Sequence, residues 1–422
     1  MIVMKCGLAI ALVLVLSLTA IAEEEYVRDM ESHIKQAQQF LQKNNLAGWL
    51  LYDFRGLNPI AREFVRPQGM VTRRWFYFVP QSGRPFALVH QIEKKSFGKI
   101  FGYVETYASR EELVHKLKQI LPGRNIILME YSAKGNNPYV SYVDAGMFEL
   151  IRSLGAKIES SQDLVQNLLA RWDQKEYQSH QEAAQILFEI KNLAFKHVAD
   201  WTRKNQNLTE YDLQQFILKE FEKNGLVTDS GPDCAVNRNS ANPHYSPTKE
   251  NSQPIRNGDF LLIDMWGKKN TPGSMYADIT WVAYVGEKVP DKYSMIFKIV
   301  AQARDFAIDY LKRNWPKSDV QGWQVDDAAR QVIRKAGYAD FFTHRTGHSL
   351  GKTIHSWGVN LDNFETRDER RIIPGVGFTI EPGIYLKDFG IRSEINLYAG
   401  EQGIKITTLP LQQEIIPLLK PR

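Results

Sequence analysis

The sequence of 422 residues contains only two cysteines, Cys6 and Cys234. Two cysteines cannot build a disulfide framework or a cysteine-based zinc cluster. The chain also lacks a dense block of lysine and arginine, and its 53 basic and 48 acidic residues leave a formal charge of only +5. This weak charge gives no reason to expect a nucleic-acid partner or a role at a membrane surface.

Long apolar runs are absent except at the N-terminus. Lys5 precedes a largely apolar run from Gly7 to Ala22, which ends in Ala-Ile-Ala and is followed by three glutamates. This pattern predicts a cleaved secretory signal over residues 1–22. The alternative is an uncleaved membrane anchor, but the run is shorter than the ~20 residues that span a bilayer. We therefore expect an exported protein, periplasmic or secreted, with no stable membrane span after cleavage.

The rest of the chain has the composition of a folded protein, because 43% of the sequence is hydrophobic. Its length suggests two domains. Short strands and helices alternate up to about residue 160, including a hairpin predicted from Trp75–Val79 and Phe86–Val89. Long helices follow, the first over Gln174–Lys204. The sequence thus predicts a mixed α/β domain over residues 23–168 and a second domain over residues 169–422.

Acidic residues occur on apolar strands of the second domain. Asp264 ends the predicted strand Phe260–Met265, and Asp278 opens the next strand. In an antiparallel hairpin the two carboxylates come close together. They would not both ionise without a cation between them. Thr280 lies on the same face as Asp278, so we expect its hydroxyl to orient that carboxylate.

Three histidines lie close together in the sequence, at His344, His348 and His355, beside Gly347 and Gly351. Neutral imidazole is a good ligand for zinc, cobalt or manganese. A single histidine is more often structural than functional, but a cluster of three beside two glycines favours a site.

Two glutamates on apolar strands complete the set, Glu381 before Pro382-Gly383 and Glu394 after Arg392. Arg392 shares a face with Glu394 and is expected to hold a ligating carboxylate in place. Four carboxylates balance the charge of two divalent cations, and one imidazole with several oxygens suits manganese, cobalt or zinc. Two such metals activate a shared water and polarise a carbonyl, which is hydrolytic chemistry.

The ordered set of Asp, Asp, His, Glu and Glu resembles the pita-bread metallopeptidases, which include Xaa-Pro aminopeptidases, Xaa-Pro dipeptidases and methionine aminopeptidases. The segment Tyr52–Gly56 with Asn58-Pro59 resembles the auxiliary domain of the Xaa-Pro subgroup. The resemblance implies an α+β protein. Its C-terminal pita-bread fold, a curved antiparallel sheet with covering helices, is preceded by a smaller mixed α/β domain of the creatinase/aminopeptidase type.

The same resemblance implies a role for each site residue. Asp264 would bind one metal, Asp278 and Glu394 would bridge both, and His348 and Glu381 would bind the second. Glu381 would also carry a proton to the leaving nitrogen. The remaining histidines would contact the substrate or line the active site: His355 at the scissile carbonyl, His244 facing the substrate, and His344.

The activity implied is that of an Xaa-Pro aminopeptidase with two divalent metal ions and a metal-bridging hydroxide as nucleophile. Manganese is the first expectation, with cobalt or zinc as alternatives. The substrates would be peptides with proline in second position, and the auxiliary domain in this family often builds homodimers. Three other functions stay open: an Xaa-Pro dipeptidase, a metal-free creatinase-like amidinohydrolase, and a non-catalytic peptide-binding module.

One feature departs from the family pattern. Asp264 and Asp278 are 14 positions apart, which is more than is usual in these peptidases. The extra residues fall within Lys268–Ser274 and predict a longer hairpin loop. An insertion at the tip of a hairpin need not disturb ligands at its base. We expect it to reshape the mouth of the pocket and so to affect substrate preference.

Overall fold

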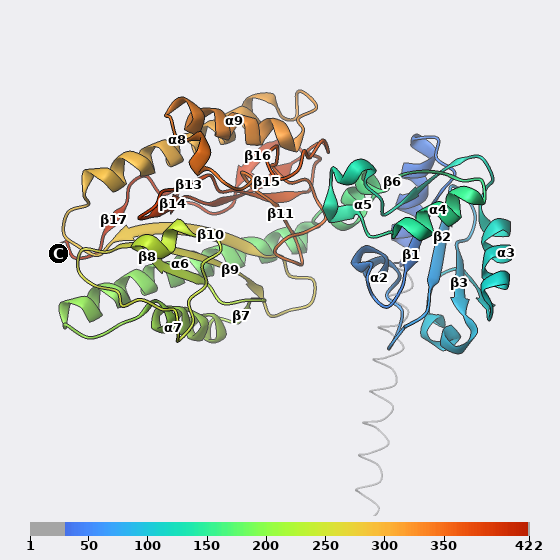
Figure 1. The fold of residues 1–422 in the computed structure, drawn as a ribbon, viewed down its shortest axis with the longest axis horizontal. Helices are drawn as coiled ribbons and strands as arrows, with labels where there is room; N and C mark the ends of the chain where they lie inside the picture. Colours follow the sequence, from blue (N-terminus) through green and yellow to red (C-terminus); the bar gives the residue numbers. More distant parts are fainter. Residues whose placement is uncertain (1–29, 421–422) are drawn as a thin grey trace, which may run out of the picture. The chain divides into compact units, whose positions relative to one another are not determined.

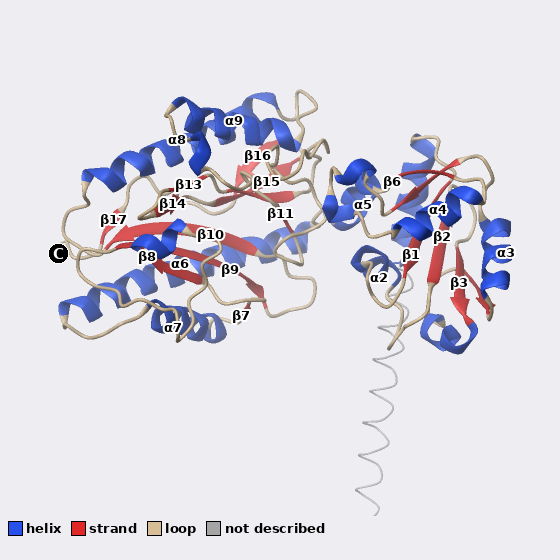
Figure 2. Ribbon diagram, in the orientation of Figure 1, coloured by secondary structure: helices blue, strands red, loops and turns tan. Residues whose placement is uncertain are grey.

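The computed structural model describes residues 30–420, so the signal predicted over residues 1–22 lies outside the described part of the chain. The chain divides into two compact units between Leu168 and Leu169. Figure 1 traces the chain through both units, and Figure 2 shows their helices and strands. Over the described range, every helix is either too short or too polar to cross a membrane.

A six-stranded mixed sheet lies at the centre of the first unit, in the order β4-β3-β2-β1-β5-β6. All residues of the central strand β1 are buried, as its apolar sequence requires. The predicted hairpin is formed by β2 and β3, which pair antiparallel. The strands are β1 (Gly48–Asp53), β2 (Trp75–Pro80), β3 (Phe86–His90), β4 (Tyr103–Tyr107), β5 (Ile126–Met129) and β6 (Lys157–Ser160).

Helices pack on this sheet and bury apolar side chains such as Leu117 and Ile151 against its strands. The helix α3 begins at the N-cap Ser109, whose side chain accepts a hydrogen bond from the Glu112 amide. A helix over residues 30–43 starts the described chain. The others are α2 (Pro59–Val65), α3 (Arg110–Ile120), α4 (Ala145–Ser153) and α5 (Gln162–Leu169).

The second unit contains three small sheets. The first has the strand order β17-β10-β9-β7, with β8 also paired to β9. The second has the order β11-β12-β15-β16, and β13 pairs with β14. The strands are β7 (Leu226–Val227), β8 (Asp233–Val236), β9 (Phe260–Lys269), β10 (Ala277–Tyr284), β11 (Ser349–Leu350), β12 (Gly377–Ile380), β13 (Gly383–Tyr385), β14 (Gly390–Arg392), β15 (Ile395–Gly400), β16 (Gly403–Ile406) and β17 (Ile416–Pro417).

Two helices, α6 (Gln174–Arg203) and α7 (Glu210–Lys223), cover one face of the β9–β10 layer (Figure 1). The helix α6 contains neither proline nor glycine, and it starts with a capping box between Asp173 and Glu176. Its apolar side chains, including Leu187 and Ile190, pack on β8, β9 and β10. This packing leaves the other face of β9 and β10 for the polar residues of the site.

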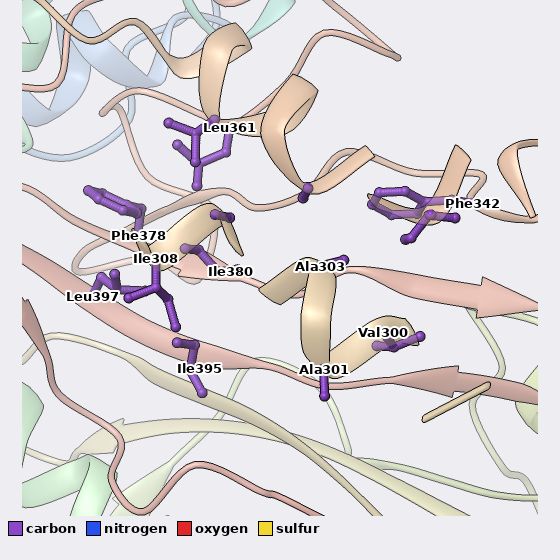
Figure 3. Close-up of a cluster of buried hydrophobic side chains, with 14 of the residues drawn as sticks. Val300, Ala301, Ala303, Ile308, Phe342, Leu361, Phe378, Ile380, Ile395 and Leu397 are labelled. Carbon is purple, nitrogen blue, oxygen red and sulfur yellow. The ribbon is translucent and has the colours of Figure 1, made fainter. Parts of the chain in front are cut away.

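The helices α8 (Asp291–Asn314) and α9 (Gly322–Lys335) cover the second sheet. They are separate helices, because α8 ends at Asn314 and α9 begins at Gly322. Figure 3 shows part of the core beneath them, where Ile308 of α8 lies near the strand residues Ile380 and Leu397. The α+β fold predicted from the sequence, with a mixed N-terminal domain and a pita-bread domain, is confirmed.

Two local predictions differ from the structure. Glu394 was expected to lie on an apolar strand, but β14 ends at Arg392 and β15 starts at Ile395, so Glu394 lies between them. The segment Lys268–Ser274 was expected to be a longer loop, but Lys268 and Lys269 still belong to β9 and pair with β7. The insertion therefore lengthens the hairpin and gives it an additional short partner strand.

Candidate metal centre

The antiparallel pairing of β9 and β10 places both aspartates on one face. Thr280 lies directly opposite Asp264, and Asp278 lies opposite Trp266, two residues further along β9. Because alternate residues of a strand share a face, Asp264 and Asp278 are diagonal neighbours. The sequence predicted that the two carboxylates come close together, and this register brings them to the same face.

The Thr280 side chain is held among carboxylates. Its Oγ1 lies 2.9 Å from Asp264 Oδ1 and 2.8 Å from Glu394 Oε2. The expectation that Thr280 orients Asp278 is therefore wrong, because its hydroxyl contacts the carboxylates of Asp264 and Glu394. Sequence spacing gave the correct face of the strand, but it did not reveal which neighbouring strand carries the closest acid.

Arg392 contacts both Asp264 and Thr280. Its Nη2 donates a short hydrogen bond to Asp264 Oδ2, and its Nε donates to Thr280 Oγ1 over 3.0 Å. The guanidinium lies 4.0 Å from Glu381 Oε2. The carboxylate that Arg392 holds most directly is therefore that of Asp264, which agrees with the expectation that it holds a ligating carboxylate in place. This buried ion pair offsets one negative charge of the centre.

The break between β14 and β15 places Glu394 in the centre, where its side chain is buried. The strand β15 then continues with Asn396, whose side chain clamps the backbone of Asp278. The Asp278 amide donates to Asn396 Oδ1 over 2.8 Å, and Asn396 Nδ2 donates to the Asp278 carbonyl over 2.7 Å. These two hydrogen bonds hold β10 against β15, and so they help to position Asp278 on β10 and Glu394, which directly precedes β15.

His348 faces two of the acids. Its Nε2 lies 3.5 Å from Asp278 Oδ2 and 3.4 Å from Glu381 Oε1. Its Nδ1 lies 3.2 Å from the Ser349 carbonyl, which can only accept, so the proton sits on Nδ1. Burial and the nearby His355 and Arg345 lower the pKa of His348 well below its usual value. The neutral ring thus directs the Nε2 lone pair at carboxylate oxygens, as a metal ligand does.

Glu381 follows β12 and is held by Thr379. Thr379 Oγ1 lies 3.0 Å from Glu381 Oε1, and the same hydroxyl accepts from the His348 amide. Burial raises the pKa of Glu381 to about 7, while Arg392 lowers it and Asp264 raises it. One threonine therefore connects the carboxylate and the imidazole loop.

The oxygens without partners indicate where a cation fits. Asp278 Oδ1 and Glu394 Oε1 are buried and meet no hydrogen-bond donor within the described range of residues. Burial raises the pKa of both carboxyls well above the usual value, and for Glu394 the charge of Asp278 raises it further. Ligand atoms of Asp278, His348 and Glu394 all lie within 4.8 Å of one another. Buried oxygens of this kind need protons or cations between them, so the donor set fits a metal.

All five predicted metal ligands thus belong to one connected group. Thr280 joins Asp264 to Glu394, and His348 lies between Asp278 and Glu381. The two groups are linked because ligand atoms of Glu394, Asp278 and His348 lie within 4.8 Å of one another.

The other predicted histidines differ in their surroundings. The ring of His355, on an exposed loop, packs edge-on against His348 with centroids 4.4 Å apart. His344 is bonded to Tyr385, with Nε2 2.7 Å from the hydroxyl, and burial lowers its pKa to about 3. His244 lies on an exposed loop, where its amide donates to the Asn242 side chain.

Sequence reasoning missed two residues that adjoin the ligands. Tyr385 accepts a hydrogen bond from Arg392 Nη1 over 3.1 Å and connects it to His344. Asp233 on β8 lies directly opposite Asp264 on β9, and burial together with Asp264 raises its pKa to about 7. The sequence does show Asp233 as an acidic residue at the start of an apolar strand. It does not show that this strand pairs with β9, and only that pairing brings Asp233 next to Asp264.

The fold and the buried carboxylate–imidazole centre define a class, the pita-bread metallopeptidases. The sequence profile of metallopeptidase family M24 matches residues 181–406, which is more than half of the chain. The chain therefore belongs to this family, and the resemblance predicted from the sequence is confirmed.

Known relatives agree with this assignment. A putative Xaa-Pro aminopeptidase of Mycoplasma genitalium is 30% identical over 230 residues, which cover 51% of this chain and 60% of the relative. An Xaa-Pro dipeptidase of Lactobacillus helveticus is 31% identical over 183 residues, which cover 43% and 45%. The chain thus spans about half the length of these curated relatives. The crystal structure of dipeptidase PepE from Mycobacterium ulcerans shares the fold, with a TM-score of 0.71, 19% identity and coverage of 93% and 98%.

Proposed function

We propose that the protein is a dinuclear-metal exopeptidase that cleaves the bond between an N-terminal residue and proline. One observation carries the proposal: three buried carboxylates, the partly buried Glu381 and one neutral imidazole meet in a connected group, and two of the carboxylate oxygens lack donors among the described residues. Family membership supports a metal-dependent peptidase. The two relatives described above, by name an aminopeptidase and a dipeptidase, support peptides with proline as substrates.

The residues that would hold the metals are Asp264, Asp278, His348, Glu381 and Glu394. Two carboxylates, those of Asp278 and Glu394, are proposed as the bridging ligands. Bound metals would supply Lewis acidity, which lowers the pKa of a water and polarises the scissile carbonyl. Manganese is the first candidate because the donors are mostly oxygen, with cobalt or zinc next.

The protein side chains then move protons and stabilise charge. Glu381 has one oxygen bonded to Thr379 and the other 4.0 Å from Arg392. In this position it can take a proton from the attacking water and pass it to the leaving proline nitrogen. His355 lies beside His348, and its proposed role is to donate a hydrogen bond to the oxygen that becomes negative. Arg392 donates a hydrogen bond to the Asp264 carboxylate and holds it in place.

Two peptides separate the proposed activity from its nearest alternative. An Xaa-Pro aminopeptidase releases the first residue from a tripeptide of the Xaa-Pro-Pro type, whereas an Xaa-Pro dipeptidase acts on Gly-Pro and releases free proline. The purified chain is incubated with a chelator, single metals are added back, and both peptides are assayed. Activity that returns with a divalent metal supports a metallopeptidase. Cleavage of neither peptide under any metal would contradict the proposed function.

We also propose that the protein is exported, as the N-terminal sequence predicts. Expression of the full chain followed by N-terminal sequencing of the mature protein tests this proposal. A mature chain starting at Glu23 is the expected result. A mature chain that retains Met1 and stays with the membrane fraction would contradict it.

A further inference from the structure

A second group of charged residues lies within the first unit. A cavity of about 580 Å³ opens between the residues after β1, the segment before β2 and the start of α3. Its lining includes four arginines and contains no aspartate or glutamate. The arginines are Arg55, Arg73, Arg74 and Arg110.

The fold offsets only part of the charge of these guanidinium groups, since Glu93 interacts electrostatically with Arg73. Across the described residues, none of the four arginines forms an ion pair with a carboxylate. The Glu93 carboxylate lies beside this segment, and its oxygens already accept hydrogen bonds from the amides of Thr72 and Arg73 and from the Thr72 hydroxyl. Four like charges around one cavity repel one another. A bound anion would relieve this repulsion.

Hydrogen bonds hold the backbone of residues 72–74, which carries two of the arginines, without any ligand. Glu93 holds the amides of Thr72 and Arg73, and the Tyr107 hydroxyl donates to the Arg74 carbonyl over 2.7 Å. The Arg74 guanidinium lies 5.3 Å from the centre of the Phe54 ring. These contacts lower the ordering cost of binding, because part of the site exists before a ligand arrives.

We propose that this cavity binds a small molecule that carries two or more oxyanion groups, phosphate or carboxylate. Guanidinium forks match both groups in a bidentate geometry. A single monovalent anion would leave most of the positive charge uncompensated, so a multiply charged ligand fits best. Phe54, Tyr107 and Leu113 also line the cavity and provide an apolar wall for the body of the ligand.

Calorimetric titration of the full chain with inorganic pyrophosphate, and separately with citrate, tests the proposal at about 0.15 M salt. We expect saturable binding of at least one probe, and the tighter probe identifies phosphate or carboxylate as the preferred group. The double variant Arg73→Ala/Arg110→Ala should bind about a hundredfold more weakly, since each arginine contact to an anion contributes about tenfold. Both residues are exposed, so their removal should leave the fold intact.

A charge-matched control separates a site from general attraction. Arg84 and Arg152 are exposed arginines of the same unit that do not line the cavity. The variant Arg84→Ala/Arg152→Ala should bind the probes as the unchanged protein does, within about twofold. The variant Arg73→Lys/Arg110→Lys keeps the charge but loses the planar forks, and it should fall between the two.

Three outcomes would overturn the proposal. The first is no saturation with either probe below roughly 10 mM, which corresponds to a very weak complex. The second is equal weakening in the cavity variant and the control variant. The third is binding to lipid phosphate in place of a soluble ligand. In that case the protein would sediment with phosphatidylglycerol vesicles but not with phosphatidylcholine vesicles, and it would bind neither soluble probe.

Discussion

The Thr280 hydroxyl offers the most direct test of how the centre is held. Replacement of Thr280 by valine removes the oxygen and keeps the branched shape of the side chain. Three contacts end with it: 2.9 Å to Asp264, 2.8 Å to Glu394 and 3.0 Å to Arg392 Nε. The hydroxyl has one proton, so it donates to one carboxylate at a time or shares the proton between both.

The magnitude follows from these contacts. A hydrogen bond to a charged group contributes ~1.5–3 kcal/mol. Loss of a partner that orients metal ligands typically weakens metal binding ~10–100-fold. We therefore expect Thr280→Val to bind manganese about 10–100-fold more weakly, and to regain peptidase activity as the metal concentration is raised.

Competition with a metal-binding dye measures this affinity directly. Thr280→Ser restores the hydroxyl and should recover most of the affinity. Thr202→Val is the matched control, because it makes the same chemical change on α6, where the hydroxyl bonds only the Val198 carbonyl. A Thr280→Val protein that binds metal as tightly as the control would refute the role assigned to this hydroxyl.

Three further predictions concern ligands, catalysis and pH. Asp278→Ala and Glu394→Ala should each purify without a full complement of metal, because each removes a bridging ligand; full loading in elemental analysis would refute the bridging assignment. His355→Ala should keep its metal but react ~10²–10³-fold more slowly, and an unchanged rate would make His355 structural. Burial lowers the pKa of His180 to about 4 from 6.5. Protonation therefore favours the unfolded chain, so stability is complete above pH 6.5 and falls by roughly 3 kcal/mol as the pH drops to 4. His180→Gln should reduce the fall of the melting temperature between pH 6.5 and pH 4, whereas His115→Gln, at an exposed position, should leave that fall unchanged. Equal dependence of the melting temperature on pH in both variants would contradict this reasoning.

Much of the fold was predictable because it depends on local patterns. The helix α6 has a capping residue, an apolar stripe and no proline or glycine, and these features determine a helix without reference to the rest of the chain. The β2–β3 hairpin has apolar strands on either side of a turn segment. The family resemblance then supplied the global arrangement, which local patterns do not contain.

The partners within the site were less predictable, since they depend on register. The side chain of Thr280 had been assigned to Asp278, two residues away in sequence, yet it bonds Asp264 on β9 and Glu394 beyond β14. Asp233 was missed for the same reason, because only the pairing of β8 with β9 places it opposite Asp264. Spacing along one strand gives a face, whereas the neighbours on that face come from other strands.

The elongated β9–β10 hairpin keeps its ligand-bearing base apart from its exposed tip. Its base carries Asp264 and Asp278 in fixed register, while its tip from Thr271 to Gly273 is exposed. A fluorescent label or a short epitope inserted at the tip would therefore report on the molecule with the ligand-bearing strands left as they are. The exposed tip is therefore a suitable insertion point that lies apart from the two ligand-bearing positions at the base.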